Sequence, residues 1–173
     1  VIFDDLTLKN THYALIFNKD IKTNNPTVRI HSSCLTGDLM GSQKCDCGYQ
    51  LETALDYMSK SKKMNILIYL NQEGRGLGIH NKIISYNIQE KGWDTYQADN
   101  ILGFSGDERD YKAAAEILKF FKVKKLNLIT NNPEKVEYLK KNKITVNKMI
   151  KIKPGVNPHN KKYLLTKKII GKH

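Results

Sequence analysis

The three cysteines of this sequence, Cys34, Cys45 and Cys47, lie in one loop-like segment, and this clustering constrains the fold more than any other feature. An odd number of thiols cannot pair off within the chain, and Cys45 and Cys47 are too close in sequence to bridge easily. Three thiolates can instead hold a zinc ion and leave its fourth tetrahedral position open, which is typical of catalytic sites. We therefore expect a fold that closes this segment around a metal.

Two other interpretations of the cysteines stay open at this point. A buried cysteine is often no more than a small apolar residue, although the glycines and acidic residues around these three favour a metal site. His31 lies just before the segment and could supply a fourth ligand. A zinc site closed by His31 would be structural rather than catalytic.

The length of 173 residues is enough for one well-packed domain and short for two independent cores. No apolar run approaches the ~20 residues that cross a membrane, and the first residues lack the basic and apolar regions of a signal peptide. Three free thiols suit a reducing compartment, so we expect a cytoplasmic protein without membrane association. The sequence does not begin with Met, which is compatible with a piece of a longer chain.

The formal net charge of +12 indicates a polyanionic partner, either a nucleic acid or a nucleoside triphosphate. The lysines are scattered, however, and their local runs at 60–63, 122–125 and 140–143 are typical of solvated helix ends and turns. The aromatic residues are not interleaved with basic ones as they are on single-strand stacking surfaces. Charge alone therefore decides little, and the aromatic pattern argues against a nucleic-acid partner.

Strand-like and helix-like segments alternate along the chain. Short apolar runs predict strands at 12–17, 26–31, 65–70, 126–130 and 144–152. Helical spacing predicts a helix that begins near Tyr49 and further helices at 79–91, 111–122, 133–141 and 163–170. This order predicts an α/β (α+β) fold, with a single domain over 1–173 and a mixed β-sheet flanked by helices. We expect the proline-containing tail, 153–173, to be loosely packed.

Three further segments carry groups suited to binding or catalysis. Gln72–Arg75 follows a strand and opens a glycine-rich loop, at the sheet edge where α/β proteins bind ligands, although a plain strand-to-helix turn would look the same. In Asp107–Asp110, either terminal aspartate could cap the next helix, or a carboxylate beside a guanidinium could act as a base near a phosphate. Pro133 begins a helix whose exposed amides, with Thr130 and Lys135, could bind an anion.

Four motifs, in this order and spacing, closely resemble GTP cyclohydrolase II, the first committed enzyme of riboflavin biosynthesis. They are HSSCLTGD…KCDCGYQLE, NQEGRGLG, GFSGDERDY and LITNNPEKVE, and the resemblance covers about residues 26–170. It implies a zinc-dependent hydrolase that opens the imidazole ring of GTP and releases carbon eight as formate. Pyrophosphate would leave too, with Mg²⁺ on the triphosphate, giving 2,5-diamino-6-ribosylamino-4(3H)-pyrimidinone 5′-phosphate. The resemblance also implies a homodimer.

The resemblance assigns roles to individual residues by their match to the family motifs. The zinc ligands would be Cys34, Cys45 and Cys47. The catalytic residues would be Asp107 as proton acceptor, Arg109 at the α-phosphorus and Tyr86 in the ring chemistry. The substrate contacts would be Arg29, Ile30, His31, Ser32, Ser33, Gln50, Glu73, Gly74, Arg75, Thr95, Thr130 and Lys135.

Chemistry leaves some of these roles open. Three thiolates give a bound zinc ion a net charge of −1, so its water is acidified less than in a three-histidine site and a nearby base is needed. Asp107 or Glu73 could serve, and Glu73 is also the nearest carboxylate for guanine recognition. The pKa of arginine exceeds ~12, so Arg109 could stabilise transition-state charge as well as attack the phosphorus.

The sequence departs from the family pattern at Ser33, and it also permits a second function. Ser33 stands where the family usually has Glu, so metal or substrate contacts of that position do not carry over with certainty. The alternative function is a non-catalytic nucleotide- or RNA-binding relative with a structural zinc. Some relatives also carry an upstream dihydroxybutanone phosphate synthase domain, and the sequence leaves that possibility open.

Overall fold

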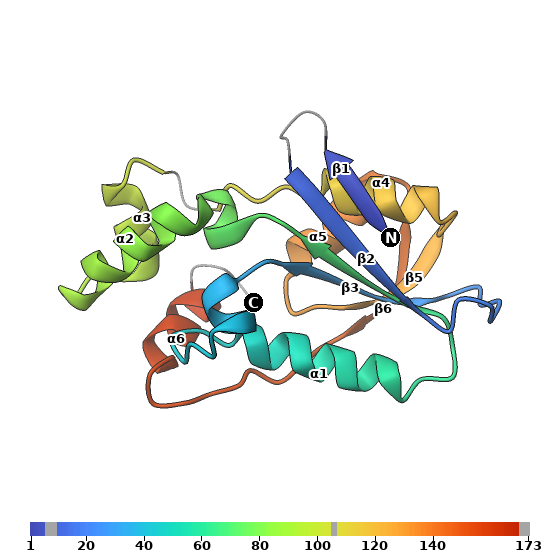
Figure 1. The fold of residues 1–173 in the computed structure, drawn as a ribbon, viewed down its shortest axis with the longest axis horizontal. Coiled ribbons are helices and arrows are strands. Elements are labelled where there is room, and N and C mark those ends of the chain that lie inside the picture. Colours follow the sequence, from blue (N-terminus) through green and yellow to red (C-terminus); the bar gives the residue numbers. More distant parts are fainter. Residues whose placement is uncertain (6–9, 105–106, 170–173) are drawn as a thin grey trace. The chain divides into compact units, whose positions relative to one another are not determined.

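The computed structural model describes residues 1–5, 10–104 and 107–169. It confirms the mixed α/β fold and the predicted alternation of strands and helices (Figure 1). The chain divides into two compact units of three segments each. Unit 1 comprises residues 1–31, 50–71 and 111–153, and unit 2 comprises residues 32–49, 72–110 and 154–173. The prediction that 1–173 form a single domain stays a prediction.

Unit 1 is built on a six-stranded sheet with the strand order β1-β2-β4-β3-β5-β6. β2 pairs antiparallel with both β1 and β4, whereas β5 pairs parallel with both β3 and β6. The sheet is therefore mixed, as predicted. Its strands are β1 (Ile2–Asp5), β2 (Asn10–Phe17), β3 (Thr27–Ser32), β4 (Asn65–Leu70), β5 (Lys125–Ile129) and β6 (Thr145–Ile150).

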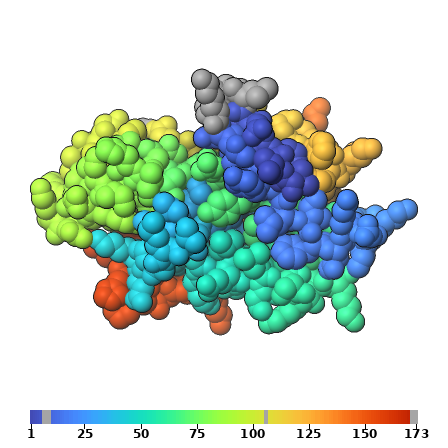
Figure 2. Space-filling view, viewed as in Figure 1, coloured from blue at the N-terminus to red at the C-terminus, as the bar shows by residue number. Residues whose placement is uncertain are grey.

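The central strands β3 and β4 are buried on both faces of the sheet, because successive strand residues point to opposite faces and apolar clusters lie on both. In β4, Ile66 and Ile68 belong to one hydrophobic cluster and Leu67, between them, belongs to the other. The first cluster includes Leu118 and Leu139 from two covering helices, and the second includes Ala54 from a third. These helices are α4 (Lys112–Phe120), α5 (Pro133–Lys141) and α1 (Cys47–Ser59). The segment of α1 lies at the surface in the space-filling view (teal, Figure 2).

Unit 2 contains the cysteine segment and is mostly helical and loop-like. Its elements are a π-helical turn η1 (Leu35–Leu39), a 3₁₀ turn η2 (Glu73–Gly76), and the helices α2 (Gly78–Glu90), α3 (Thr95–Ile101) and α6 (Lys161–Ile169). Helix α3 was not predicted, although a capping box starts it. The Asp94 side chain accepts from the backbone N–H groups of Tyr96 and Gln97, and the Gln97 side chain accepts from the Asp94 N–H.

One local prediction from the sequence is wrong, and one strand was not predicted. Neither Asp107 nor Asp110 caps the helix that follows them, because α4 has Tyr111 at its N-cap and no side-chain cap there. Strand β1 was missed because it is a short strand at the edge of the sheet, too short to show clear alternation. Among the described residues, no helix is both long and apolar enough to cross a membrane.

Candidate metal centre and active site

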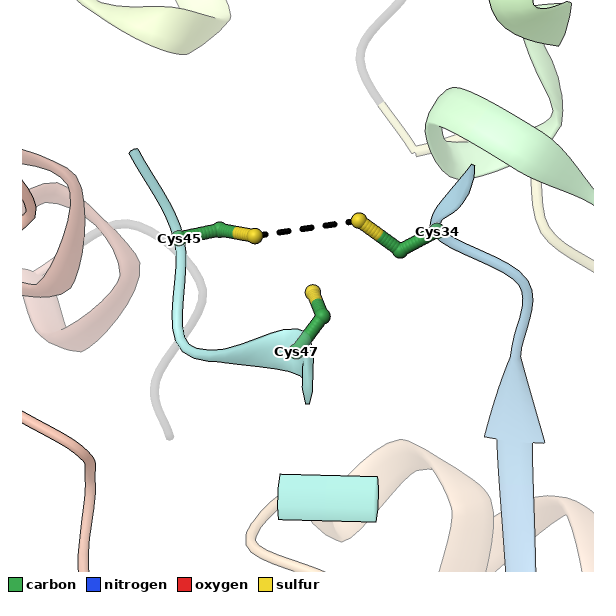
Figure 3. A group of neighbouring side chains, drawn as sticks. All are labelled: Cys34, Cys45 and Cys47. Carbon is green, nitrogen blue, oxygen red and sulfur yellow. Dashed lines mark hydrogen bonds between the residues drawn. The ribbon is translucent and has the colours of Figure 1, made fainter. Parts of the chain in front are cut away.

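The three cysteines meet in unit 2, with their sulfur atoms pointing toward one another (Figure 3). The three Sγ atoms all lie within 4.8 Å of one another, and the Cys34 and Cys45 sulfurs are 3.7 Å apart. Tetrahedral zinc with Zn–S bonds of about 2.3 Å separates its sulfur ligands by about 3.8 Å. The 3.7 Å between the Cys34 and Cys45 sulfurs matches this value, and the third sulfur is close enough for all three thiols to bind one zinc ion.

Two glycines make room for this cluster. A Cβ atom at Gly37 would lie 2.8 Å from the Cys45 sulfur and 3.0 Å from the Cys34 sulfur. A Cβ atom at Gly48 would lie 2.3 Å from the carbonyl oxygen of Gly37, which is closer than any real contact. The backbone of η1 and the start of α1 can approach each other only because both positions lack a side chain.

The electrostatics of the thiols also suit a cation. Hydrogen bonds from the Cys45 and Cys47 thiols, together with the Lys82 ammonium, lower the pKa of Cys34. A hydrogen bond with the Cys34 sulfur raises the pKa of Cys45 to about 11, and a separate hydrogen bond with the Cys34 sulfur raises the pKa of Cys47. Cys34 is thus the most acidic of the three thiols. A metal that takes all three as thiolates would release the protons that they still carry.

His31, the alternative fourth ligand, lies in unit 1 and makes other contacts there. Its Nδ1 atom is 3.3 Å from the Arg29 guanidinium, and its ring stacks on Tyr69 at 5.5 Å. Among the described residues, the three cysteines form a group of potential metal ligands whose donor atoms lie close together. His31 does not belong to this group. This finding favours a site with an open position over a closed structural site.

Polar side chains surround Cys34. The carboxylate of Asp38 accepts a hydrogen bond from the Cys34 backbone N–H at 3.0 Å and so fixes the turn that carries the thiol. The Thr36 hydroxyl lies 3.8 Å from the Cys34 sulfur and 3.2 Å from the hydroxyl of Tyr86, on α2. Burial raises the pKa of Tyr86, so its phenol stays protonated near neutral pH. Tyr86, predicted to be catalytic, is therefore one hydroxyl away from the cysteine cluster.

Glu73, the alternative base, is held by three donors. Its Oε1 atom accepts from the Lys82 ammonium at 2.7 Å and from the Gly74 N–H at 3.0 Å. Its Oε2 atom accepts from the Leu35 N–H at 2.5 Å. Lys82 also donates to the Cys34 sulfur at 3.0 Å. These bonds fix the carboxylate beside the cysteine turn.

Lys82 was not among the site residues predicted from the sequence. A usable signal existed, because Lys82 precedes Tyr86 by one helical turn and the two share a face of α2. Its ammonium lies 5.9 Å from the centre of the Tyr86 ring.

Asp107 and Arg109 form a close ion pair at the start of the loop that precedes α4. The Arg109 Nε atom donates to Oδ1 of Asp107 at 2.7 Å, and the second nitrogen of its fork donates to Oδ2. Burial alone would raise the pKa of Asp107, but the hydrogen bonds and charge of Arg109 hold it below the usual value. Asp107 is therefore ionised at neutral pH, and it orients the guanidinium of Arg109 in a bidentate geometry.

The loop that carries this pair is tied to η2. The Glu108 N–H donates to the carbonyl oxygen of Arg75 at 3.1 Å, and the Asp110 N–H donates to the side chain of Gln72 at 3.3 Å. A Cβ atom at Gly76 would lie 3.1 Å from the Glu108 backbone, so the close approach requires glycine. Gly76 also has a φ of 92°, in the left-handed region.

We expect Asp107→Asn to lower the free energy of unfolding by about 0.5–1 kcal/mol at pH 7, because the pair is partly exposed to solvent, where ion pairs contribute little more than this. Because the folded-state pKa of Asp107 is depressed, its contribution is fully present above the unfolded pKa of about 4. It is lost as the pH falls through the folded pKa. Urea unfolding of both proteins between pH 7 and pH 2.5 should show two curves that converge in acid. A difference that stays constant down to pH 2.5 would contradict the ionic origin of the effect.

Ser32 and Ser33, two of the predicted substrate contacts, both accept hydrogen bonds from Gln72, the residue before η2. The Gln72 backbone N–H donates to the Ser33 hydroxyl at 3.1 Å, and its side-chain amide donates to the Ser32 hydroxyl at 2.8 Å. Ser33 therefore has a positioning contact that needs only one hydroxyl. A carboxylate is not required for this bond.

Arg75 and Thr95 belong to the part of unit 2 around α3. Arg75 has a φ of 60° and its guanidinium lies 3.3 Å from Asp99 and 4.3 Å from the centre of the Tyr96 ring. Burial raises the pKa of Asp99, although Arg75 and the Ser85 hydroxyl act in the opposite direction. Thr95, the first residue of α3, lines a cavity of about 510 Å³ together with Trp93.

The other predicted substrate contacts lie in unit 1, at the carboxyl ends of β3 and β5. Arg29 donates to the Gln50 side chain at 2.9 Å and to the carbonyl oxygen of Ile129 at 3.2 Å. Lys135 donates to the carbonyl oxygen of Ile30 at 2.8 Å. Arg29 and Lys135 are each only 5% exposed. Two buried cations next to the ends of neighbouring parallel strands make this edge suited to an anion.

The turn before α5 has the predicted form. Pro133 is the first helical residue, and the Asn132 side chain caps the helix by accepting from the Glu134 N–H at 2.8 Å. The Thr130 hydroxyl accepts from the Asn132 N–H at 3.0 Å, which fixes the turn internally. The predicted residues are thus divided between two groups: Arg29, Ile30, His31, Gln50, Thr130 and Lys135 in unit 1, and the cysteines and the remaining residues in unit 2.

The carboxyl-terminal segment supports the cysteine loop within unit 2. Asn160 is fully buried, and its amide donates to the carbonyl oxygens of Gly155 at 2.7 Å and Cys45 at 3.4 Å. Lys167 lies 3.5 Å from the buried carboxylate of Asp46. A residue of the tail thereby contacts the backbone of one metal-ligand candidate. This contact could not be predicted from the sequence, because Asn160 and Cys45 are 115 positions apart in the chain.

Asn160→Ala should speed the release of zinc from the protein about 10- to 100-fold, the usual cost of losing a group that orients a metal ligand. The reason is that the Cys45 carbonyl and the 155–160 turn lose their shared donor. Transfer of zinc to a coloured chelator measures the rate. Asn147→Ala, which removes an exposed amide from β6, is the matched control and should leave the rate unchanged. Equal rates in all three proteins would show that the tail does not support the metal centre.

Comparisons with known proteins point to one family. A family model described as GTP cyclohydrolase II matches residues 1–151. A curated relative from Psychromonas ingrahamii, named GTP cyclohydrolase-2, is 48% identical over 166 residues, which is 95% of this chain and 82% of the relative. Relatives of the same name from Helicobacter acinonychis and Blochmanniella pennsylvanica are 48% and 46% identical, over 91% and 95% of this chain and 79% and 82% of theirs.

Proposed function

Because the chain belongs to the GTP cyclohydrolase II family, we propose that it is an enzyme of riboflavin biosynthesis that hydrolyses GTP. The reaction breaks both bonds from carbon eight of guanine to its ring nitrogens, consumes one water for each and releases formate. A further water cleaves the bond between the α- and β-phosphates and releases pyrophosphate. The product is 2,5-diamino-6-ribosylamino-4(3H)-pyrimidinone 5′-phosphate. The observation that carries the proposal is the gathering of three thiols within the matched region.

Cys34, Cys45 and Cys47 would hold the zinc ion. When bound, the ion would supply Lewis acidity for hydrolysis of the carbon–nitrogen bonds. The spacing of the sulfurs and the space that Gly37 leaves for them support this assignment. Tyr86 would donate its phenolic proton to a ring nitrogen as the bond to carbon eight breaks, because burial keeps that proton in place near neutral pH.

Asp107 and Arg109 would act as a pair. The Asp107 carboxylate would hold the fork of Arg109 toward the α-phosphate, where the guanidinium stabilises the charge that develops during pyrophosphate release. The depressed pKa of Asp107 makes it a weak proton acceptor while it is paired. It would accept a proton more readily once the phosphate draws Arg109 away, because the carboxylate then loses its strongest donor.

The remaining family positions would bind substrate. Arg29, Arg75 and Lys135 supply cations for a triphosphate that carries up to about four negative charges. Glu73 and the backbone of Gly74 would face guanine, whose N1–H and amino group need an acceptor. Ile30, His31, Ser32, Ser33, Gln50, Thr95 and Thr130 are the other proposed contacts. Mg²⁺ would accompany the triphosphate, and the protein would be a cytoplasmic homodimer.

Mass spectrometry of the products tests this function. Protein loaded with one zinc ion per chain and given GTP and Mg²⁺ should yield formate and pyrophosphate in equal amounts, with the pyrimidinone phosphate as the third product. A fully metallated, folded protein that binds GTP and leaves it intact would instead identify a non-catalytic relative with a structural zinc.

A further inference from the structure

We propose that Lys82 is a positioning residue of the metal centre: its ammonium hydrogen-bonds the Cys34 sulfur and thereby fixes that ligand and weakens its electron donation to the metal. The proposal goes beyond the family assignment of ligands and catalytic residues. It rests on the proposed function only in that the three cysteines hold a metal.

The contact is built into unit 2 rather than being a chance approach of a surface lysine. Lys82 Nζ lies 3.0 Å from the Cys34 sulfur and 2.7 Å from Oε1 of Glu73. The two side chains are only 12% and 11% exposed. A Cβ atom at Gly74 would lie 3.1 Å from Cβ of Lys82, so the stem of the lysine passes close to the η2 backbone. The ammonium therefore has little freedom to leave the sulfur.

The contacts form a closed ring around Cys34. Lys82 binds the Cys34 sulfur and Glu73, and the other carboxylate oxygen of Glu73 accepts from the N–H of Leu35, the next residue after Cys34. One ion pair thus holds both the side chain and the following peptide of this ligand. Side chains that orient a ligand in this way commonly set metal affinity and electronic character.

The chemical consequence follows from charge. Three thiolates around a divalent cation carry a net charge of −1, which reduces the acidity of the metal. A charge-assisted N–H···S hydrogen bond draws electron density from one sulfur, so that ligand donates less to the metal. The effect falls on Cys34 alone, because Lys82 is described in contact with that sulfur and not with those of Cys45 or Cys47. The three ligands are therefore predicted to differ in reactivity.

Alkylation of the zinc-loaded protein by iodoacetamide, mapped by peptide mass spectrometry, tests this asymmetry. In Lys82→Met, which keeps the length of the side chain, Cys34 should be alkylated about 10-fold faster than in the parent protein, since a thiolate without a donor is more nucleophilic. The rates at Cys45 and Cys47 should change much less. Lys82→Arg, which keeps charge and donors, should restore slow alkylation of Cys34.

Lys44→Met is the matched control. Lys44 pairs with Glu90 at 2.7 Å and lies 4.9 Å from the centre of the Tyr86 ring, so it is a nearby cation without a described contact to sulfur. Alkylation of Cys34 in this variant should match the parent. An equal acceleration in Lys44→Met would assign the effect to general charge and overturn the proposal, as would an unchanged Cys34 rate in Lys82→Met.

The absorption spectrum of the cobalt-substituted protein gives a second readout. The sulfur-to-cobalt charge-transfer band should move to longer wavelength in Lys82→Met, because the free thiolate is a better donor, and return in Lys82→Arg. Loss of metal from both variants with the fold intact would make Lys82 merely structural and overturn the proposal. Neither readout depends on GTP turnover, so failure of this proposal and failure of the proposed function are distinguishable.

Discussion

Cys45→Ser is expected to abolish metal binding and formate release together. Cys45 supplies one of three sulfur atoms that lie within 4.8 Å of one another, and a serine hydroxyl is a weak ligand for zinc at neutral pH. Loss of a ligand should exceed the ~10- to 100-fold cost of losing a group that merely orients one. We expect less than a tenth of the parent's zinc content after dialysis, and formate release lower by more than ~100-fold.

The control for this substitution is Met40→Ser, which introduces the same side chain at an exposed position of the same loop. It should retain zinc and activity. Zinc content is measured by atomic emission and formate on the same sample, so that loss of metal and loss of activity are detected separately. Parent-like formate release from a Cys45→Ser protein without metal would refute the assignment of the cysteines to the active site.

Arg109→Lys is expected to lower kcat for pyrophosphate release about 100- to 1,000-fold, as for the removal of one positioned donor from a developing charge. The lysine keeps the positive charge but lacks the planar fork that binds both oxygens of Asp107. Zinc content should stay at one ion per chain, because a guanidinium is not a ligand for zinc. Rapid quenching with separation of the nucleotide products measures the rate.

The products of Arg109→Lys also show whether the two hydrolyses are separable. Accumulation of a ring-opened triphosphate would mean that the protein opens the ring without cleaving the phosphate. Lys91→Ala, which removes an exposed cation at the end of α2, is the control for net charge and should retain parent activity. Parent-like kcat in Arg109→Lys would contradict a role that depends on the guanidinium fork.

The sequence predicted those parts of the fold whose signals are local. The continuous apolar run at 65–70 predicted β4 with its bounds, and Pro133 predicted the start of α5, because both signals lie within a few residues of the chain. The cysteine cluster was predicted for the same reason, since its members lie close together in the chain. The structure confirms the cluster, because the three sulfur atoms lie within 4.8 Å of one another.

What the sequence missed depends on contacts between distant residues or on polar signals. Helix α3 lacks a clear apolar period, and the polar capping box of Asp94 and Gln97 starts it. Asp107 was considered as a helix cap, but the fork of Arg109 binds its carboxylate. Lys82 and Cys34 are 48 positions apart, and Asn160 and Cys45 are 115 apart, so only the folded chain reveals these pairs.

Formate release from GTP labelled at carbon eight tests most directly that the three cysteines form a catalytic zinc centre. Protein stripped of metal should release no labelled formate, and one equivalent of zinc should restore release to the level of the untreated enzyme. Restoration should be absent in Cys45→Ser. Labelled formate released at the full rate by the stripped protein, or a zinc-loaded protein that leaves the label in GTP, would contradict the account.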